Sequence, residues 1–485
     1  MLLPASLFCL LQAWFALADT PPTQLSLNSL HAFSAATLNP TMYTLPVSTN
    51  PLSISVALCS YATSNPPRFF VANDSTTTPG PNTLGQPNVY EIELNTTALG
   101  AWTGDMLNFG VLAIYNATQS PFEVGVSDNG PIHQFLDTLP LLGDTTTNQV
   151  LLFSPPFSPP SISQPTYPNY TLPSANLTFP SEPSSPSDWA LFIAPTSSPA
   201  FASLPRTGCA MRAAAGNVGF YKTSSNSEGL WLRDSDGWRW QWFINGLTPQ
   251  TNYTVYGVTN GTQVSGPIYF VTKSAAFACT IVYSVPFCPS VAYAAPLPNS
   301  DPAAGITGSM LPDNMTENLL SGMANFTVML TTLACGRDLY SPLVTCADCQ
   351  AAYRTWLCLV SFPRCTEYPT SSTTSASSNS TSTASLAQVT PALQVQDAAN
   401  PRNPYLPAFS ENYTALLPCI EMCNAVDRAC PPFLGFACPK PQYTASWSYG
   451  VGYIDSGEKG EVGGGSTGTA ADRWGNVYCN AGGFL

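Results

Sequence analysis

The side chains that usually carry out acid–base catalysis are scarce in this sequence. Only two of its 485 residues are histidines, His31 and His133, which leaves little material for a general base or a histidine-rich metal site. We expect both on the surface. The run Gly464 to Gly468 (GGSTG) matches the G-x-S-x-G pattern of hydrolases but lacks the strand and helix that expose the serine there, so a flexible loop is the better interpretation. The sequence predicts no enzyme, no small-molecule substrate and no cofactor.

Two short patterns could exchange electrons or bind a metal. Cys346 to Cys349 (CADC) has the redox C-x-x-C spacing, but it lies among many other cysteines and outside any βαβ pattern, which favours structural disulfides. Asp234 to Gly237 (DSDG) resembles part of a calcium loop whose later acidic ligands are missing, so we expect a turn. Zinc is disfavoured because exported thiols oxidise first. The sequence predicts no metal site.

Fifteen cysteines are the clearest chemical feature of the chain. If Cys9 is removed with a signal peptide, an even number remains, which suits a disulfide framework in an oxidising compartment. Spacing alone does not choose the pairing, and whether Cys59 meets Cys209 stays open. The candidates for disulfides are Cys59, Cys209, Cys279, Cys288, Cys335, Cys346, Cys349, Cys358, Cys365, Cys419, Cys423, Cys430, Cys438 and Cys479.

The first residues have the pattern of a signal peptide. Leu2 to Ala18 is an uncharged apolar run that ends in small-x-small residues before Asp19, which predicts a signal peptide over residues 1–18. An uncleaved anchor is the alternative, but the run is shorter than the roughly 20 residues that a membrane helix needs. A positive charge near Met1 is missing, and whether cleavage occurs stays open. We expect the chain to enter the secretory pathway and reach the extracellular face of the plasma membrane, and also to occur in the endoplasmic reticulum.

Acceptors for N-linked glycans support export. Eleven Asn-x-Ser/Thr sites occur, and those that are used must lie on surface loops. Which of them are used stays open, because a chain so rich in Ser and Thr produces some sites by chance. The candidates are Asn73, Asn95, Asn116, Asn169, Asn176, Asn252, Asn260, Asn314, Asn325, Asn379 and Asn412.

Charge and composition exclude several classes of protein. Charged residues make up only 9% of the chain, against about 25% in an ordinary soluble domain. A formal net charge of −13 repels phosphate, so no nucleic-acid partner is expected. The chain is nevertheless 44% hydrophobic and 11% aromatic, which is enough apolar surface for large cores. At ~150 residues a domain, its length indicates about three domains.

The first half of the chain is predicted to be all-β. Residues 19–150 alternate apolar and polar side chains, as at Leu52, Ile54 and Val56, which predicts a β-sandwich. Residues 151–186 are rich in Pro and Ser and read as an extended spacer or an edge strand. Residues 187–275 predict a second sandwich, in which alternating tryptophans at 238, 240 and 242 face the core and Tyr253 matches the tyrosine corner of fibronectin type III domains.

A long uncharged stretch, residues 274–300, could be taken for a membrane span. It contains Pro286, Pro289, Pro296 and Pro298, and each proline removes a backbone donor from the helix that a bilayer demands. We therefore expect disulfide-bonded strands and turns there. If the protein lies at a membrane, we expect a partner to hold it there.

Residues 276–485 are predicted to form a small, mainly α, cysteine-rich domain. The segments 346–360 and 414–428 contain good helix formers, and we interpret them as short helices joined by disulfides. Residues 366–410 form a low-complexity loop, whose centre at 371–385 is almost wholly Ser, Thr, Ala and Asn and cannot bury apolar surface.

The residues around these cysteines are more specific than their number. Together they resemble the cysteine-rich region of the fungal stretch-activated calcium-channel accessory subunits of the mating-pheromone-induced-death type. The resemblance extends into the second sandwich and so covers most of the mature chain. The segments that carry it are Cys335 to Pro342 (CGRDLYSP), Cys346 to Cys365, Leu417 to Pro439 and Pro286 to Ala294.

The resemblance implies a fold and a function. It implies a glycoprotein that works with a large four-repeat, voltage-gated-like pore subunit to bring calcium into fungal cells under pheromone, membrane-stretch or cell-wall stress. It also implies a frizzled-like fold for the cysteine-rich domain, shared with an auxiliary subunit of animal sodium-leak channels that caps the pore protein outside the cell. In this interpretation the chain is not itself the pore, although older descriptions call the family a channel.

Charged and aromatic residues in the matching segments are candidates for the contact with the pore subunit, and packing inside the domain is an equal alternative for each of them. A secreted cell-wall carbohydrate-binding or adhesion protein remains the rival function, because it would share the sandwiches and the glycans. The candidates for partner binding are Arg337, Asp338, Tyr340, Arg354, Arg364, Asp427 and Arg428.

Overall fold

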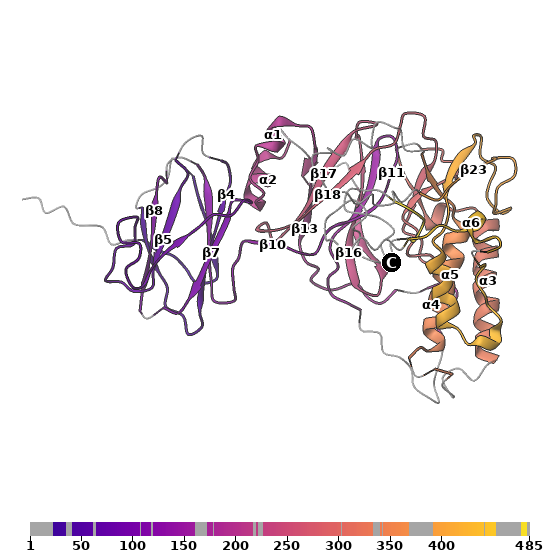
Figure 1. Ribbon diagram of the computed structural model, residues 1–485, viewed down its shortest axis with the longest axis horizontal. Helices are drawn as coiled ribbons and strands as arrows, with labels where there is room; N and C mark the ends of the chain where they lie inside the picture. Colours follow the sequence, from indigo (N-terminus) through magenta and orange to yellow (C-terminus); the bar gives the residue numbers. More distant parts are fainter. Residues whose placement is uncertain are drawn as a thin grey trace, which may run out of the picture. The chain divides into compact units, whose positions relative to one another are not determined.

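The computed structural model folds into two compact units, residues 1–133 and 134–485, each described here by itself (Figure 1). The signal-peptide prediction over residues 1–18 lies outside the described residues. The structure describes residues 23–34, 41–61, 65–106, 108–117, 120–160, 172–177, 179–216, 220–221, 227–301, 303–332, 340–341, 343–367, 391–440, 442–452 and 477–482.

The first unit is a sandwich of two sheets, with strand orders β1-β3-β8-β5-β6 and β2-β9-β4-β7. Its core is built from the alternating residues noted in the sequence, because Leu52, Ile54 and Val56 of β4 are fully buried between the sheets. The strands are β1 (Thr23–Gln24), β2 (Ser29–Phe33), β3 (Met42–Leu45), β4 (Leu52–Leu58), β5 (Arg68–Ala72), β6 (Val89–Ile92), β7 (Leu99–Gly104), β8 (Gly110–Tyr115) and β9 (Phe122–Ser127).

The second unit begins with another pair of sheets, β10-β18-β17-β13-β14 and β11-β12-β16-β15. Two short helices, α1 (Pro199–Ala202) and α2 (Gly208–Ala214), lie between β13 and β14 in the chain. The strands are β10 (Gln134–Leu136), β11 (Leu141–Thr145), β12 (Gln149–Phe153), β13 (Trp189–Pro195), β14 (Phe220–Tyr221), β15 (Ser227–Asp234), β16 (Gly237–Asn245), β17 (Asn252–Thr259) and β18 (Gln263–Val271).

The boundary between the two sandwiches differs from the expected one at residue 150. Strand β12 pairs with β16, and Val150 and Leu152 share a core with Trp189 and Trp242. Residues 134–153 therefore belong to the second sandwich, because their apolar side chains complete its core. The expected spacer at 151–186 also contributes to packing, since the ring of Phe179 lies 4.8 Å from that of Trp231.

The tryptophan strand and the tyrosine corner have the predicted geometry. Trp238 and Trp242 of β16 are buried, and Trp240 packs against the same core as Trp242. The backbone N–H of Thr248 donates to the hydroxyl of Tyr253 over 2.9 Å. The Asp234 to Gly237 segment is the hairpin turn between β15 and β16, in which Asp234 accepts from the backbone N–H of Asp236.

We expect Tyr253→Phe to lower the free energy of unfolding of the second unit by about 1–2 kcal/mol, because the Thr248 N–H loses its acceptor while the ring stays in place. Urea unfolding measures this. Tyr443→Phe is the matched control, since Tyr443 is 76% exposed. Equal stability of the Tyr253→Phe variant and the unchanged protein would contradict the prediction.

The C-terminal part combines helices with two small sheets, β20-β19-β21 and β22-β24-β23. The stretch 274–300 contains β19 and β20 and their connecting turns. The strands are β19 (Thr280–Tyr283), β20 (Tyr293–Ala295), β21 (Ile306–Thr307), β22 (Arg364–Thr366), β23 (Leu393–Gln396) and β24 (Tyr413–Leu416). The helices are η1 (Gly308–Met310), α3 (Asp313–Thr332), α4 (Cys346–Ser361), α5 (Ile420–Ala429), η2 (Pro432–Leu434) and α6 (Ala445–Ser448).

Helices α3, α4 and α5 form the main helical layer of this part (Figure 1). Helix α4 starts with a capping box, in which Thr345 and Asp348 satisfy each other's backbone N–H groups. Helix α3 was not among the predicted elements, although buried residues recur along one of its faces at helical spacing. Residues 414–416 were predicted in a helix and 393–396 in a loop, whereas both are strands that pair as β24 and β23. The buried residues of α3 are Met315, Leu319, Met323, Phe326 and Leu330.

Candidate functional site

Disulfides hold the helical part together. Two disulfides join helix α4 to segments that precede and follow it in the sequence: Cys358 is bonded to Cys288, and Cys349 is bonded to Cys430. Since Cys349 pairs with Cys430, the CADC motif is not a redox pair. The other described bonds are Cys279–Cys365, Cys419–Cys479 and Cys423–Cys438. Cys59, Cys209 and Cys346 are also disulfide-bonded, and Cys335 lies outside the described residues.

Arg354, a candidate for partner binding, is buried inside this part. Its guanidinium donates to the carbonyl oxygens of Ser174, Ala175 and Phe287, so it joins α4 to the segment between β12 and β13. Burial lowers the pKa of Arg354 to about 10. The assignment of Arg354 to an interface is therefore wrong: its donors are engaged inside the domain, and it acts in packing.

Arg364 is also unavailable to a partner. Its Nε lies 2.8 Å from Asp144 Oδ2, and both side chains are more than nine-tenths buried. Asp144 also accepts from the backbone N–H groups of Thr145 and Ala294. The pair joins strand β11 of the sandwich to strand β22 of the cysteine-rich part, so the interface prediction for Arg364 is corrected to a structural role.

The remaining candidates differ in exposure. The hydroxyl of Tyr340 donates to the carbonyl oxygens of Thr345 and Ala429, which fixes the start of α4 against the end of α5. Asp427 and Arg428 are exposed on α5 and stay available to a partner. Arg337 and Asp338 lie outside the described residues.

Most of the predicted glycan acceptors within the described residues are on the surface. Asn73 is the exception, because it is half-buried and its amide donates to the carbonyl of Asp105. Asn169 and Asn379 lie outside the described residues. The exposed acceptors are Asn95, Asn116, Asn176, Asn252, Asn260, Asn314, Asn325 and Asn412.

His133 is buried, which corrects the expectation that both histidines lie on the surface. Its Nδ1 lies 3.0 Å from Ser55 Oγ and its Nε2 lies 3.5 Å from Glu123 Oε2. The hydroxyl oxygen of Ser55 also accepts from the backbone N–H groups of Ile132 and His133. Although the contact order Ser–His–Glu resembles a hydrolase triad, the serine is fully buried and already engaged. The three residues therefore join strands β4 and β9 to the loop after β9 and offer no accessible nucleophile.

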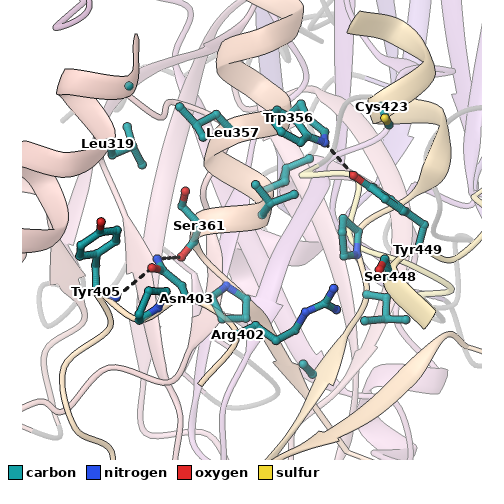
Figure 2. A pocket seen from close by; sticks show the side chains of 18 of the residues that line it. Leu319, Trp356, Leu357, Ser361, Arg402, Asn403, Tyr405, Cys423, Ser448 and Tyr449 are labelled. Carbon is teal, nitrogen blue, oxygen red and sulfur yellow. Dashed lines mark hydrogen bonds between the residues drawn. The ribbon is translucent and has the colours of Figure 1, made fainter. Parts of the chain in front are cut away.

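A groove of about 640 Å³ opens beside helices α3 and α4, and we call it the α3–α4 groove. Figure 2 shows Leu319 and Leu357 from the two helices facing Asn403 and Tyr405 from the loop between β23 and β24. The remaining walls come from residues 415–418, from Cys423 and from the segment 436–449, which carries α6. Six separate stretches of chain build this groove, and for that reason the sequence contained no signal for it.

Two of the polar side chains that line the α3–α4 groove, those of Trp356 and Asn403, are engaged in hydrogen bonds within it. Trp356 Nε1 donates to the hydroxyl of Tyr449 over 2.9 Å, and Asn403 binds the carbonyl of Ser361 and the N–H of Tyr405 (Figure 2). Among the lining residues that the structure describes, Arg402 is the one that carries a charge. The result is an apolar surface with a single positive charge.

Among the residues that the structure describes, no helix combines the length and the apolar character needed to cross a bilayer.

Comparison with known sequences gives one family. The model of the Mid1 family, described as a stretch-activated Ca2+-permeable channel component, matches residues 52–464. The chain is 38% identical to the stretch-activated cation channel MID1 of Cryptococcus neoformans, over 74% of this chain and 62% of that protein. It is 31% identical to the stretch-activated cation channel MID1 of Saccharomyces cerevisiae, over 43% of this chain and 36% of that protein. The chain thus spans less than two thirds of these relatives' length.

Among solved structures, the FN1–FN3 domains of chicken CNTN1 match 47% of this chain and 62% of their own. The sequence identity is 12% and the TM-score is 0.15, so this likeness supports no conclusion about the fold.

Proposed function

Because the chain belongs to the Mid1 family of stretch-activated Ca2+-permeable channel components, we propose that it is an extracellular auxiliary subunit of a fungal voltage-gated-like calcium channel. In this proposal calcium passes through a separate, large four-repeat pore subunit. The auxiliary subunit supports calcium influx in response to pheromone, membrane stretch or cell-wall stress. Its cysteine-rich part, from about residue 276, docks on the extracellular loops of the pore, and a frizzled-like fold is proposed for that part.

The disulfides are the observation that supports an extracellular position most directly. Five described bonds join residues that lie 15 to 86 positions apart, and structural disulfides of this kind persist in oxidising compartments. The exposed glycan acceptors are in keeping with that location. A disulfide-rich channel component is consistent with the secretory pathway and a membrane-associated site of action.

The packing of α3 supports the view that the pore belongs to a partner. This helix of 20 residues buries Met315, Leu319 and Met323 in a core that also contains the Cys288–Cys358 bond. Its other side exposes Asp313, Glu317 and Asn325 to solvent. An amphipathic helix that uses its apolar stripe for the core of a disulfide domain serves a structural role there.

Affinity isolation of the full chain from fungal membranes tests the proposal. We expect a large polytopic channel protein in the isolated complex. A second expected result is loss of stress-induced calcium uptake in cells that lack this chain. Recovery of cell-wall polysaccharide without any channel polypeptide would contradict the proposal and favour the rival carbohydrate-binding function.

A further inference from the structure

We propose that the α3–α4 groove receives an apolar segment of the pore-forming subunit that carries a carboxylate, and that Arg402 binds this carboxylate. The inference rests on the proposed function, because it names the surface through which this chain would contact the channel. It goes further by giving the chemistry of the contacting segment.

The apolar part of the groove favours hydrophobic side chains. Leu319, Leu357 and Phe436 line it together with the rings of Trp356 and Tyr405. Its volume of about 640 Å³ leaves room for several side chains. Tyr, Trp and Arg are the residues that carry most of the binding energy in protein interfaces, and this groove offers all three.

The hydrogen bonds inside the groove disfavour a polar ligand. The indole N–H of Trp356 is bound to Tyr449, and the side chain of Asn403 is bound to Ser361 and Tyr405. A sugar or another polyhydroxyl ligand needs free partners, since a buried polar group without a hydrogen bond is costly. The indole N–H of Trp356 and the amide oxygen of Asn403 already have partners, so they offer little to such a ligand.

Arg402 supplies the charge complementarity. It is exposed, and its Nη1 donates to Gln394 Oε1, which steadies the guanidinium beside the groove. The whole chain has 28 acidic and 15 basic residues. Because the overall charge repels acidic partners, a cation at the edge of an apolar groove gives a carboxylate a specific place to bind.

The two other occupants of such a groove are a second copy of this chain and a lipid. A second copy would have to place an acidic residue and an apolar segment in the groove, and it would give a dimer of the purified protein. If the groove binds an anionic lipid, the purified protein would bind vesicles that contain phosphatidylserine. Both are outcomes of the test.

The test uses the full tagged chain, co-expressed with the pore subunit in fungal cells. We expect Arg402→Glu and Leu357→Asp to lower recovery of the pore at least tenfold, while Arg402→Lys keeps most of it. Val328→Asp is the matched control, because Val328 lies on the same helix as Leu319, is 61% exposed and does not line the groove. Yield and disulfide state of each secreted variant show whether it is folded.

Two failures are distinguishable. If the unchanged protein recovers no pore, the proposed function is wrong. If the unchanged protein recovers the pore and folded Arg402→Glu and Leu357→Asp recover it equally well, only the groove proposal is wrong. The groove proposal would also be overturned if these variants recovered the pore as before but lost a dimer that the unchanged protein forms, or lost binding to phosphatidylserine vesicles. The occupant would then be a second copy of the chain or a lipid, respectively.

Discussion

Removal of the Cys288–Cys358 bond will strongly destabilise the cysteine-rich part. Both cysteines are fully buried, and the bond closes a sequence separation of 70 residues in the centre of the core that packs α3 and α4. For a loop of that size the chain-entropy argument gives about 4 kcal/mol. Since a typical domain is stable by only about 5–15 kcal/mol, we expect the Cys288→Ala, Cys358→Ala variant to be secreted poorly or not at all.

The Cys423–Cys438 bond provides the matched control for this prediction. It closes a separation of only 15 residues, and Cys438 is half-buried. The same argument gives about 3 kcal/mol, with no loss of a core contact at Cys438. Secreted yield and urea unfolding measure both variants. A larger loss of stability in the Cys423→Ala, Cys438→Ala variant than in the core variant would contradict this ranking.

Arg364→Met will also destabilise the second unit, by about 3–5 kcal/mol, because it leaves the carboxylate of Asp144 buried without its cation. Adding Asp144→Asn to Arg364→Met should restore more than half of the loss. The amide carries no charge, and its one oxygen keeps an acceptor for one of the two backbone N–H groups, those of Thr145 and Ala294, that bind different oxygens of Asp144. Thermal unfolding of the three proteins measures the effect.

The control for Arg364→Met is Arg68→Met, which breaks a bidentate pair with Glu91 on the surface of the first unit. The Arg68 side chain is 44% exposed, so the expected cost is under about 1 kcal/mol. Similar losses for Arg364→Met and Arg68→Met would show that the buried pair carries no special weight. In that case Arg364 would not be the link between the sandwich and the cysteine-rich part.

Local patterns in the sequence predicted where strands occur better than they predicted which sandwich each strand belongs to. The alternation at Leu52, Ile54 and Val56 and the tyrosine corner at Tyr253 depend on near neighbours, and both appear as expected. Residues 134–153 have the same alternating pattern as the strands before them. No local pattern shows that β12 pairs with β16, which lies some 90 residues further along the chain. The boundary was therefore predicted at residue 150, whereas the first unit ends at residue 133.

Buried cations were the part of the site that the sequence could least reveal. Arginine is seldom fully buried, so an isolated Arg in a sequence is read as a surface residue. Arg364 finds Asp144 at a separation of 220 residues, and Arg354 finds carbonyl groups at separations of about 180. The partners that make burial tolerable are visible only once the chain is folded. The same is true of the α3–α4 groove, whose walls come from six stretches of sequence.

Calcium flux into vesicles tests most directly whether ions pass through a partner. We predict that vesicles containing the purified chain alone take up no more calcium than empty vesicles, with or without osmotic stretch. We also predict that vesicles containing the co-purified pore subunit take up calcium. Stretch-dependent uptake by the chain alone, abolished by a channel blocker, would contradict the account.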